Sequence, residues 1–328
     1  MLYDNHGRII NYLRLAVTDR CNLRCYYCMP STGLDWLPAK ELMTFEEMLS
    51  ICSLLACMGI DKIRITGGEP FIRKDIMQFL DSLVRIPGIQ KVAVTTNGVL
   101  TNSFIPELKK IGINSFNLSL DSLDRKRFIS ITGRDELDAV LHTLESLLQH
   151  DMDIKINAVV MDGKNTEDIL QLVTLTRTLP VTVRFIEEMP FNGDSHNFSG
   201  VKWNYVRILE TIKNHFPAMQ KIPDPSSSTS FNYAIPGHKG NVGVIAAYTR
   251  SFCGSCNRIR ITPRGMLKTC LYDSGVFNIK DMIRKGCSMH TIESALHNAL
   301  GKRVRNGWEA QKLSSDPLLH QSMAAIGG

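Results

Sequence analysis

Residues 12–30 read YLRLAVTDRCNLRCYYCMP, and the prediction of the fold starts from this stretch. It begins as an apolar run typical of a buried β-strand and ends in a loop with three cysteines, Cys21, Cys25 and Cys28. In α/β enzymes, functional side chains gather in the loops that follow parallel strands. The stretch therefore predicts a parallel strand whose following loop carries a cysteine site.

The strand-then-helix pattern continues from this stretch to about Glu187. Strands are predicted at Tyr12–Thr18, Lys62–Thr66, Lys91–Thr95, Ser115–Leu120, Asp153–Val160 and Val181–Ile186. Helices are predicted at Phe45–Met58, Lys74–Val84, Asn102–Lys110, Leu137–His150 and Glu167–Leu179. Repeated βα units favour a parallel sheet, and six of them favour an open barrel over a closed eight-stranded one. The predicted fold class is α/β, a partial (βα)6 barrel.

The pattern changes after Glu187. A helix is predicted at Tyr205–Asn214, and Pro223–Ser230, rich in turn formers, reads as a linker or an exposed loop. Later strands are predicted at Val242–Tyr248, Arg258–Thr262 and Met266–Cys270, and later helices at Ile279–Lys285 and Ile292–Leu300. They suggest a smaller sheet, so we expect a core domain over residues 1–222 and a smaller α+β domain over residues 223–328.

The composition of the 328 residues is that of a globular protein, with 44% hydrophobic and 21% charged residues. Neither a membrane-spanning apolar run nor a signal-peptide pattern occurs, so we expect a cytoplasmic protein. Cytosolic thiols stay reduced, so its nine cysteines indicate metal or redox chemistry rather than disulfides. The net charge of +6 is most simply a solvated surface.

The first cysteine site has the spacing C-x3-C-x2-C. A structural zinc ion takes four protein ligands, and no fourth cysteine or histidine lies nearby in the sequence. Three thiolates suit a [4Fe–4S] cluster with one iron left open. A dithiol pair at Cys25 and Cys28, or simple burial of the thiols, would leave the third cysteine unexplained.

The second cysteine site comprises Cys253, Cys256 and Cys270, with the spacing C-x2-C-x13-C. It again offers three ligands and predicts a second [4Fe–4S] cluster. The alternative is a zinc ribbon with Cys287 as fourth ligand. Two further cysteines, Cys52 and Cys57, fall in a predicted amphipathic helix and read as core packing.

These motifs resemble those of a known family. The C-x3-C-x2-C motif with Tyr27 before its last cysteine, and the sequence GGEP at residues 67–70, resemble the signature of radical S-adenosylmethionine enzymes. The segments LAVTDRCN, IRITGGEP, VTTNG, NLSLD, RFIEEMP and FCGSCNRIR, with the terminal Gly327 and Gly328, resemble the MoaA-type GTP 3′,8-cyclases of molybdenum cofactor biosynthesis. The resemblance spans nearly the whole chain.

The resemblance implies a reaction and its cofactors. S-adenosylmethionine would bind the open iron of the first cluster, and its reductive cleavage would give a 5′-deoxyadenosyl radical. That radical would take the 3′ hydrogen of GTP, and the ribose would then close onto C8 of guanine, giving (8S)-3′,8-cyclo-7,8-dihydroguanosine 5′-triphosphate. The cofactors carry this chemistry, while the protein supplies binding and orientation.

The resemblance also implies site residues. Contacts to S-adenosylmethionine are implied for Tyr27, Gly68, Ser119 and Met189. Contacts to GTP are implied for Arg14, Arg64, Thr95, Lys155, Arg258 and Arg260, and the tail of Gly327 and Gly328 is expected in the active site. Guanidinium groups suit a triphosphate because their planar donors match phosphate oxygens.

Expected partners follow from the same resemblance: GTP, an electron donor such as a flavodoxin or ferredoxin, and a downstream cyclic pyranopterin monophosphate synthase. We expect no nucleic acid or membrane partner, and a monomer or homodimer. Two alternatives remain open at this point. One is a peptide-modifying radical enzyme with an auxiliary cluster, and the other is a non-catalytic zinc or RNA-binding protein.

Overall fold

The computed structural model describes residues 1–30, 32–191, 200–313 and 322–327. Its strands are β1 Leu2–Tyr3, β2 Ile9–Ile10, β3 Tyr12–Ala16, β4 Lys62–Thr66, β5 Lys91–Thr96, β6 Ser115–Ser119, β7 Asp153–Val160, β8 Thr182–Glu187, β9 Gln220–Lys221, β10 Ser230–Ala234, β11 Asn241–Ile245, β12 Arg258–Ile261, β13 Met266–Lys268 and β14 Phe277–Asn278. Its α-helices are α1 Phe45–Cys57, α2 Ile76–Val84, α3 Ile105–Lys110, α4 Arg125–Thr132, α5 Leu137–Gln149, α6 Asp168–Thr178, α7 Tyr205–His215, α8 Ile279–Arg284, α9 Met289–Gly301, α10 Gly307–Leu313 and α11 Met323–Ile326.

One twelve-stranded sheet dominates the described residues, in the order β14-β13-β12-β3-β4-β5-β6-β7-β8-β11-β10-β9. All neighbouring pairs from β12 to β11 in this order are parallel. The two ends of the sheet, β14 and β9, do not pair with each other. The result is an open barrel, as the repeated βα units predicted.

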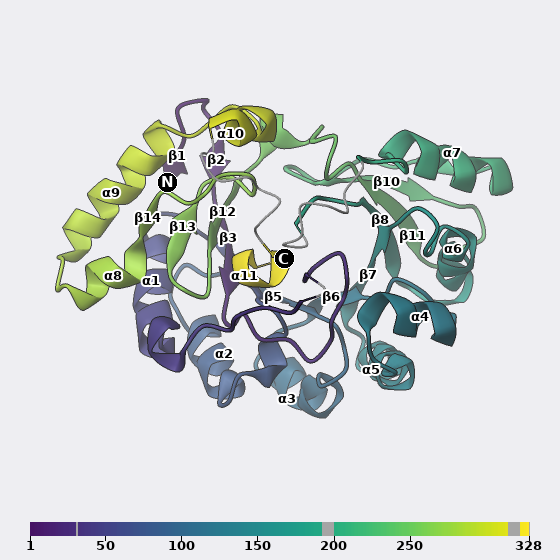
Figure 1. Cartoon of the computed structure of the whole chain (residues 1–328), viewed down its shortest axis with the longest axis horizontal. Coiled ribbons are helices and arrows are strands. Elements are labelled where there is room, and N and C mark those ends of the chain that lie inside the picture. The colour runs from purple at the N-terminus through teal and green to yellow at the C-terminus, as the bar shows by residue number, and fades with distance from the viewer. Residues whose placement is uncertain (31, 192–199, 314–321, 328) are drawn as a thin grey trace.

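The sheet curves around a central space, and helices cover its outer surface (Figure 1). Alternation along the strands explains this arrangement. In β7, Ile154, Ile156 and Ala158 are buried while Lys155 and Asn157 are partly exposed. Because strand side chains point alternately to the two faces, apolar residues face the helices and polar residues face the central lumen.

Side-chain caps fix the first turn of several helices. Thr44 and Glu47 form a capping box at the start of α1, and Asp124, Asn204 and Ser288 accept hydrogen bonds from the first turns of α4, α7 and α9. The buried faces of these helices pack on the sheet in one large hydrophobic core. That core fixes the strands whose opposite face forms the lumen.

The C-terminal strands differ from the expectation of a separate smaller sheet. Strand β12 pairs with β3, and β11 pairs with β8, so late segments extend both sides of the barrel sheet. Their alternating pattern predicted strands but could not identify their partners, because pairing depends on tertiary packing. The domain boundary near residue 222 stays a prediction.

Several short elements escaped the sequence pattern. The hairpin β1–β2 and the helices α4, α10 and α11 were not predicted. Cys57 also lies elsewhere than expected, since it is exposed rather than packed in the core, and Cys287 lies in the segment between α8 and α9. Cys52 is fully buried, as predicted.

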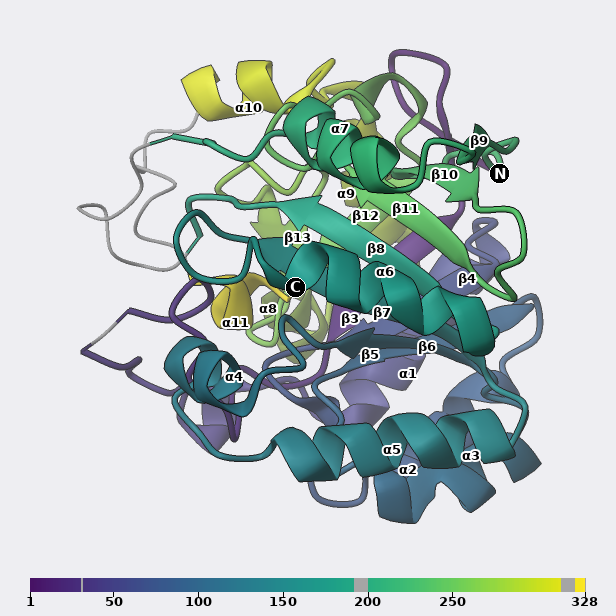
Figure 2. The ribbon, with the colours of Figure 1, turned by 90° about the vertical axis from the view of Figure 1, so that its right-hand side faces the viewer.

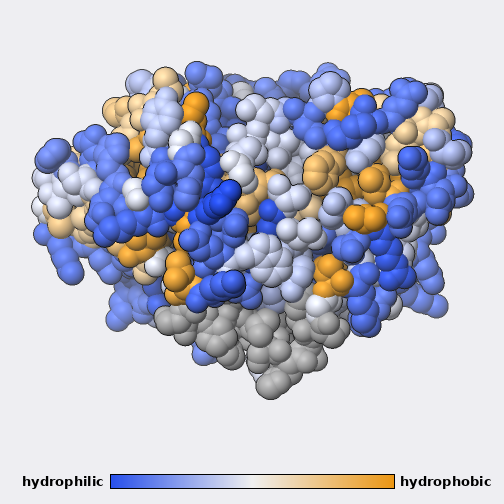
Figure 3. All heavy atoms as spheres, turned by 90° about the horizontal axis from the view of Figure 1, so that it is seen from above, coloured by the Kyte–Doolittle hydropathy of each residue, from blue (hydrophilic) through white to orange (hydrophobic). Residues whose placement is uncertain are grey.

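The view from above shows a largely hydrophilic face with separate, smaller hydrophobic patches (Figure 3). Trp308 in α10 and Val206 in α7 are among the large hydrophobic side chains that remain exposed. Single exposed apolar residues are normal in globular proteins. In the part of the chain that the structure describes, none of the helices has the length and apolar character needed to cross a bilayer.

Candidate active site

The first cysteine site lies in the loop after β3, at the carboxyl end of the barrel strands. A tight turn holds the loop: the backbone N–H groups of Cys28 and Met29 both donate to the carbonyl of Cys25, over 2.9 and 3.0 Å. Asn97, after β5, donates to the Cys21 sulfur over 3.5 Å. The three thiols are half-buried and belong to one short segment, as ligands of one cluster should.

The GGEP segment packs directly on this loop. A Cβ on Gly68 would lie 2.2 Å from the carbonyl oxygen of Arg20, so only glycine fits. Glu69 is fully buried and accepts hydrogen bonds from Phe71 N, Thr96 Oγ1 and Asn97 N over 3.2, 2.9 and 2.7 Å. The segment therefore joins the ends of β4 and β5 to the cysteine loop.

Carboxylates, not cations, dominate the surroundings of the first site. Burial raises the pKa of Glu69 to about 7 and that of Asp121 to about 6. Tyr27 donates from its hydroxyl to Asp121 over 2.9 Å. Burial also raises the pKa of Cys21 to about 11 and that of Cys28 to about 12. Without metal, the fold therefore favours neutral thiols here.

The positions predicted to bind S-adenosylmethionine surround the same end of the barrel. Tyr27 belongs to the cysteine loop, Gly68 follows β4, Ser119 ends β6, and Met189 follows β8. Met189 packs against a small second hydrophobic cluster with Phe191 and Tyr272. The roles of these four residues stay predictions. At Gly68 the backbone of Arg20 approaches closely, which explains the need for glycine there.

The second cysteine site lies at the opposite end of the barrel. Cys253 and Cys256 directly precede β12, and Cys270 follows the antiparallel β13. Because β12 pairs in parallel with β3, a site before β12 and a site after β3 lie at opposite ends of those strands. A strand of five residues spans roughly 16 Å at about 3.3 Å per residue. The two sites therefore face each other along the barrel.

Cations line the lumen between the two sites. The sheet register places Arg260, Arg14 and Arg64 directly beside one another on β12, β3 and β4. Tyr12 accepts a hydrogen bond from Arg64 over 2.7 Å. Burial alone would raise the pKa of Tyr12, but the positive charges of Arg64, Arg14 and Lys62 lower that pKa to about 7. The lumen is therefore strongly electropositive and suited to an anionic ligand.

The opposite wall adds Lys155 on β7 and Arg184 on β8. Burial lowers the pKa of Lys155 to about 8, with the cations of Arg184 and Lys91 adding to the effect while Asp153 opposes it. Burial likewise lowers the pKa of Arg184 to about 10, with Arg64 as the next cause. Arg184 was not among the predicted site residues, although its place in the alternation of TVRFIE, between Val183 and Phe185, marks it as lumen-facing.

Polar atoms without a protein partner also face this lumen. Thr95 Oγ1, Asn117 Oδ1 and Asn157 Oδ1 are buried and make no hydrogen bond to the described residues. They lie on the neighbouring strands β5, β6 and β7, and the register pairs Thr95 with Asn117. Buried polar groups normally find a partner, so these atoms indicate a place for a polar ligand.

The C-terminal segment reaches the lumen between the two sites. Ser322 donates to the carbonyl of Cys28 over 2.6 Å, and the carbonyl of Gly327 accepts from Arg260 over 2.9 Å. Figure 2 shows α11 at the same end of the strands as the loop after β3. Gly327 therefore contacts a cation of the lumen, and its role at the active site stays a prediction, while Gly328 lies outside the described residues.

The remaining predicted residue, Arg258, lies at the second site. Its guanidinium donates to the carbonyl of Ser227 over 2.6 Å, so the loop at residues 223–230 packs against the site. Among the described residues, no three His, Cys, Asp or Glu side chains converge on a single metal ion. An iron–sulfur cluster does not need such convergence, since each cysteine binds a different iron.

Comparison with known proteins matches this geometry. Residues 15–176 match the model of the Radical SAM superfamily, and residues 181–307 match the model described as Molybdenum Cofactor Synthesis C. The GTP 3′,8-cyclase of Clostridium perfringens is 37% identical over 99% of this chain and 99% of its own length. The chain belongs to the GTP 3′,8-cyclase family. This family of radical SAM enzymes uses S-adenosylmethionine and two [4Fe–4S] clusters.

Longer relatives and a solved structure agree. Molybdenum cofactor biosynthesis protein 1 of Bos taurus is 39% identical over 93% of this chain, but the chain spans only 48% of its length. The crystal structure of Streptococcus suis SuiB bound to S-adenosylmethionine shares the fold, with a TM-score of 0.59 and 16% identity, over 88% of this chain and 68% of that one.

Proposed function

We propose that this chain is a GTP 3′,8-cyclase that catalyses the first step of molybdenum cofactor biosynthesis. The observation that carries the proposal is an electropositive lumen held between two three-cysteine sites. Four of its cations, Arg14, Arg64, Arg184 and Arg260, are arginines, which match phosphate oxygens with paired donors. A nucleoside triphosphate is the kind of ligand that such a lumen would accept.

The residues fit the two clusters and S-adenosylmethionine. Each site offers three half-buried thiols on short loops, which suits a cluster with one open iron. When bound, the first cluster and S-adenosylmethionine supply the 5′-deoxyadenosyl radical that abstracts the 3′ hydrogen of GTP. The protein's own part is to hold the nucleotide between the two ends of the barrel.

The chain's residues would orient the substrate from several strands at once. The triphosphate would lie against Lys155, Arg184 and Arg64, while Thr95 on β5 offers a buried hydroxyl that has no hydrogen-bond partner among the described residues. Arg258 and Arg260 lie on the same face of β12, so both cations would act beside the second site. Groups fixed on strands hold a substrate more precisely than groups on loops.

Partners and compartment belong to the same proposal. The reductant would be a flavodoxin or ferredoxin, the product would pass to a cyclic pyranopterin monophosphate synthase, and the chain would act in the cytoplasm as a monomer or homodimer. Cysteines that must stay reduced to bind iron–sulfur clusters fit a reducing compartment.

The test is turnover by anaerobically purified protein. Brown protein with about eight irons per chain is expected; colourless zinc protein would contradict the radical chemistry. Reduced protein incubated with S-adenosylmethionine and GTP should form 5′-deoxyadenosine together with a cyclised nucleotide. Formation of 5′-deoxyadenosine without any cyclised nucleotide would reject GTP as substrate while leaving the radical SAM assignment intact.

A further inference from the structure

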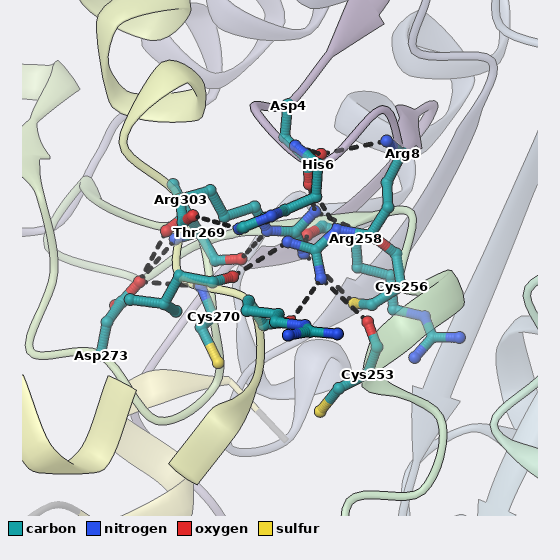
Figure 4. Close-up of polar contacts among 12 residues, drawn as sticks. Asp4, His6, Arg8, Cys253, Cys256, Arg258, Thr269, Cys270, Asp273 and Arg303 are labelled. Atoms are coloured by element: carbon teal, nitrogen blue, oxygen red, sulfur yellow. Dashed lines mark hydrogen bonds and ion pairs between the residues drawn. The ribbon is translucent and has the colours of Figure 1, made fainter. Parts of the chain in front are cut away.

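Arg303 is buried against the second cysteine site and has an acceptor for every one of its hydrogen-bond donors (Figure 4). A guanidinium carries five N–H groups. Its Nε donates to the carbonyl of Thr269 over 2.9 Å. Nη1 donates to Asp4 Oδ2 and to the carbonyl of Cys256, both over 3.0 Å. Nη2 donates to the carbonyl of Arg258 over 2.9 Å and to the Cys256 sulfur over 3.2 Å.

Asp4 fixes the direction of this guanidinium from the far side. Its carboxylate is buried and also accepts from the Arg8 side chain over 2.6 Å and from the backbone N–H groups of His6 and Arg8 over 2.9 and 3.0 Å. The ring of His6 contacts the carbonyl oxygen of Arg303 over 2.9 Å. The hairpin β1–β2 thus holds Arg303 from both its backbone and its charged end.

The contact with the Cys256 sulfur brings positive charge to one of the three predicted ligands. Arg303 Nη2 lies 3.2 Å from that sulfur, and the guanidinium is buried. Arg258, two residues along the chain from Cys256, adds a second cation beside the site. The guanidinium of Arg303 therefore favours negative charge at this sulfur.

The same contact acts on a cluster bound at this site. Hydrogen bonds to the sulfurs and the charge of the surroundings help to set the reduction potential of an iron–sulfur cluster. One-electron reduction adds negative charge, and a buried cation that donates to a ligand sulfur stabilises that charge. Among the hydrogen bonds of the described residues, this contact joins an arginine side chain to one of the six predicted ligand sulfurs.

We propose that Arg303 is a positioning residue that raises the reduction potential of the cluster at Cys253, Cys256 and Cys270 by donating to the Cys256 sulfur, with Asp4 holding the guanidinium in place. This inference rests on the proposed function only in requiring that the second site hold a cluster. The ligand is a [4Fe–4S] cluster, and the reductant in the test is dithionite, which gives it one electron.

The first test compares Arg303→Lys with Arg305→Lys in the full chain, each with Cys21, Cys25 and Cys28 replaced by alanine so that only the second cluster is titrated. Lysine keeps the charge beside Asp4 but cannot serve five acceptors. The equilibrium constant for reduction should fall about tenfold in Arg303→Lys, a shift of about 59 mV to more negative potential. Arg305, which is exposed, should show no shift. An unchanged potential in Arg303→Lys overturns the proposal.

A second measurement needs no substitution and decides the question if Arg303→Lys fails to assemble. Protein with both clusters is grown with arginine labelled with 15N in the guanidinium group alone. Electron spin-echo spectroscopy of the reduced second cluster should then show 15N coupling. A second cluster without any guanidinium coupling overturns the proposal.

The experiments separate the role of Arg303 from the proposed function of the chain. If the unsubstituted protein binds no cluster at the second site, the proposed function fails, and this inference fails with it. If the cluster is present and its potential does not depend on Arg303, only this inference fails. If GTP is not converted although the potential shifts as expected, the role of Arg303 stands and the substrate assignment falls.

Discussion

The two cysteine sites each offer three thiols, but the charged groups around those thiols differ. At the first site, Glu69 and Asp121 are the charged groups that most affect the cysteines, and the pKa values of the thiols are raised. At the second site, Arg258 and Arg303 lower the pKa of Cys256 despite its burial. Identical ligand sets can therefore hold clusters of different redox behaviour.

The difference in surrounding charge suits different roles for the two clusters. Added electrons are disfavoured near carboxylates and favoured near guanidinium groups, so the first cluster should be the stronger reductant and the second the easier one to reduce. Cleavage of S-adenosylmethionine needs a strong reductant, and substrate binding needs positive charge. The barrel places these two conditions at its two ends.

The largest expected effect comes from removing one ligand at each site. Cys25→Ala should abolish 5′-deoxyadenosine formation and leave about four irons per chain. Cys256→Ala should also lose about half of the iron and abolish nucleotide cyclisation, but should still cleave S-adenosylmethionine. Iron analysis and product chromatography measure both effects. Cys52→Ala and Cys57→Ala are the controls, and serious loss of activity in either would mean that the ligand assignment is wrong.

In the metal-free chain, acid should change the stability contributions of two buried carboxylates in opposite directions, one at each cysteine site. Burial raises the pKa of Asp4, but bonds from Arg8 and His6 and the Arg8 charge outweigh it, so the folded-state pKa lies below 3.8. Asp4 thus contributes stability above pH 3.8 that is lost as the pH falls through its folded-state pKa. Asp4→Asn should cost about 3 kcal/mol at pH 7, and the difference from wild type should shrink in acid.

Asp121→Asn, at the first cysteine site, is compared with Asp4→Asn because the pKa of Asp121 is shifted in the opposite direction. Burial raises the folded-state pKa of Asp121 to about 6, so its contribution is full below pH 3.8 and is lost as the pH rises through 6. Wild type should therefore gain stability relative to Asp121→Asn on going from pH 7 to pH 4. Urea unfolding at several pH values measures both variants, and parallel pH profiles would refute the electrostatic contrast.

Removing Arg184 should weaken GTP binding in the electropositive lumen without changing either cluster. A hydrogen bond to a charged group contributes about 1.5–3 kcal/mol, so Arg184→Gln should weaken GTP binding about 10- to 100-fold. Iron content should not change. Calorimetry of GTP binding measures the loss, and Arg177→Gln, an exposed arginine on α6, is the control. Equal losses in both variants would point to a general charge effect.

The smallest effect is a pH dependence of binding through Lys155. Its pKa of about 8 means that the free lumen loses this positive charge as the pH rises through 8. GTP affinity should then fall by up to about tenfold per pH unit above pH 8, until the pKa of the bound state is reached. Lys155→Arg should keep its charge and show a flatter profile. A wild-type profile as flat as that of the variant would contradict a phosphate role for Lys155.

Sequence patterns predicted the barrel strands well because each combines β-forming residues with a clear end. Lys62–Thr66 and Asp153–Val160 have the predicted bounds. The hairpin β1–β2 could not be predicted, since its strands have two residues each and their stability comes from packing against distant segments.

The residues of the candidate site also fall into those that the sequence could predict and those that it could not. Spacing alone marked the six cysteines, because few other chemistries need three thiols at such intervals. The alternation in TVRFIE places Arg184 on the polar face of its strand, but only the tertiary fold shows that this face lines a lumen. Arg303 lies in GKRVRNG, a basic turn typical of a solvated surface, and its burial depends on Asp4, which approaches from nearly the other end of the chain. No local pattern contains that contact.

The pairing of β3 with β12 has a consequence for biosynthesis. During translation, the N-terminal cysteines emerge long before Arg258–Ile261 can pair with the strand that precedes them. Until then one edge of β3 stays open, and neither Arg303 nor Ser322 has reached its place beside the cysteines. Iron delivery must therefore wait until the ribosome has released nearly the entire polypeptide, or act on a half-built barrel.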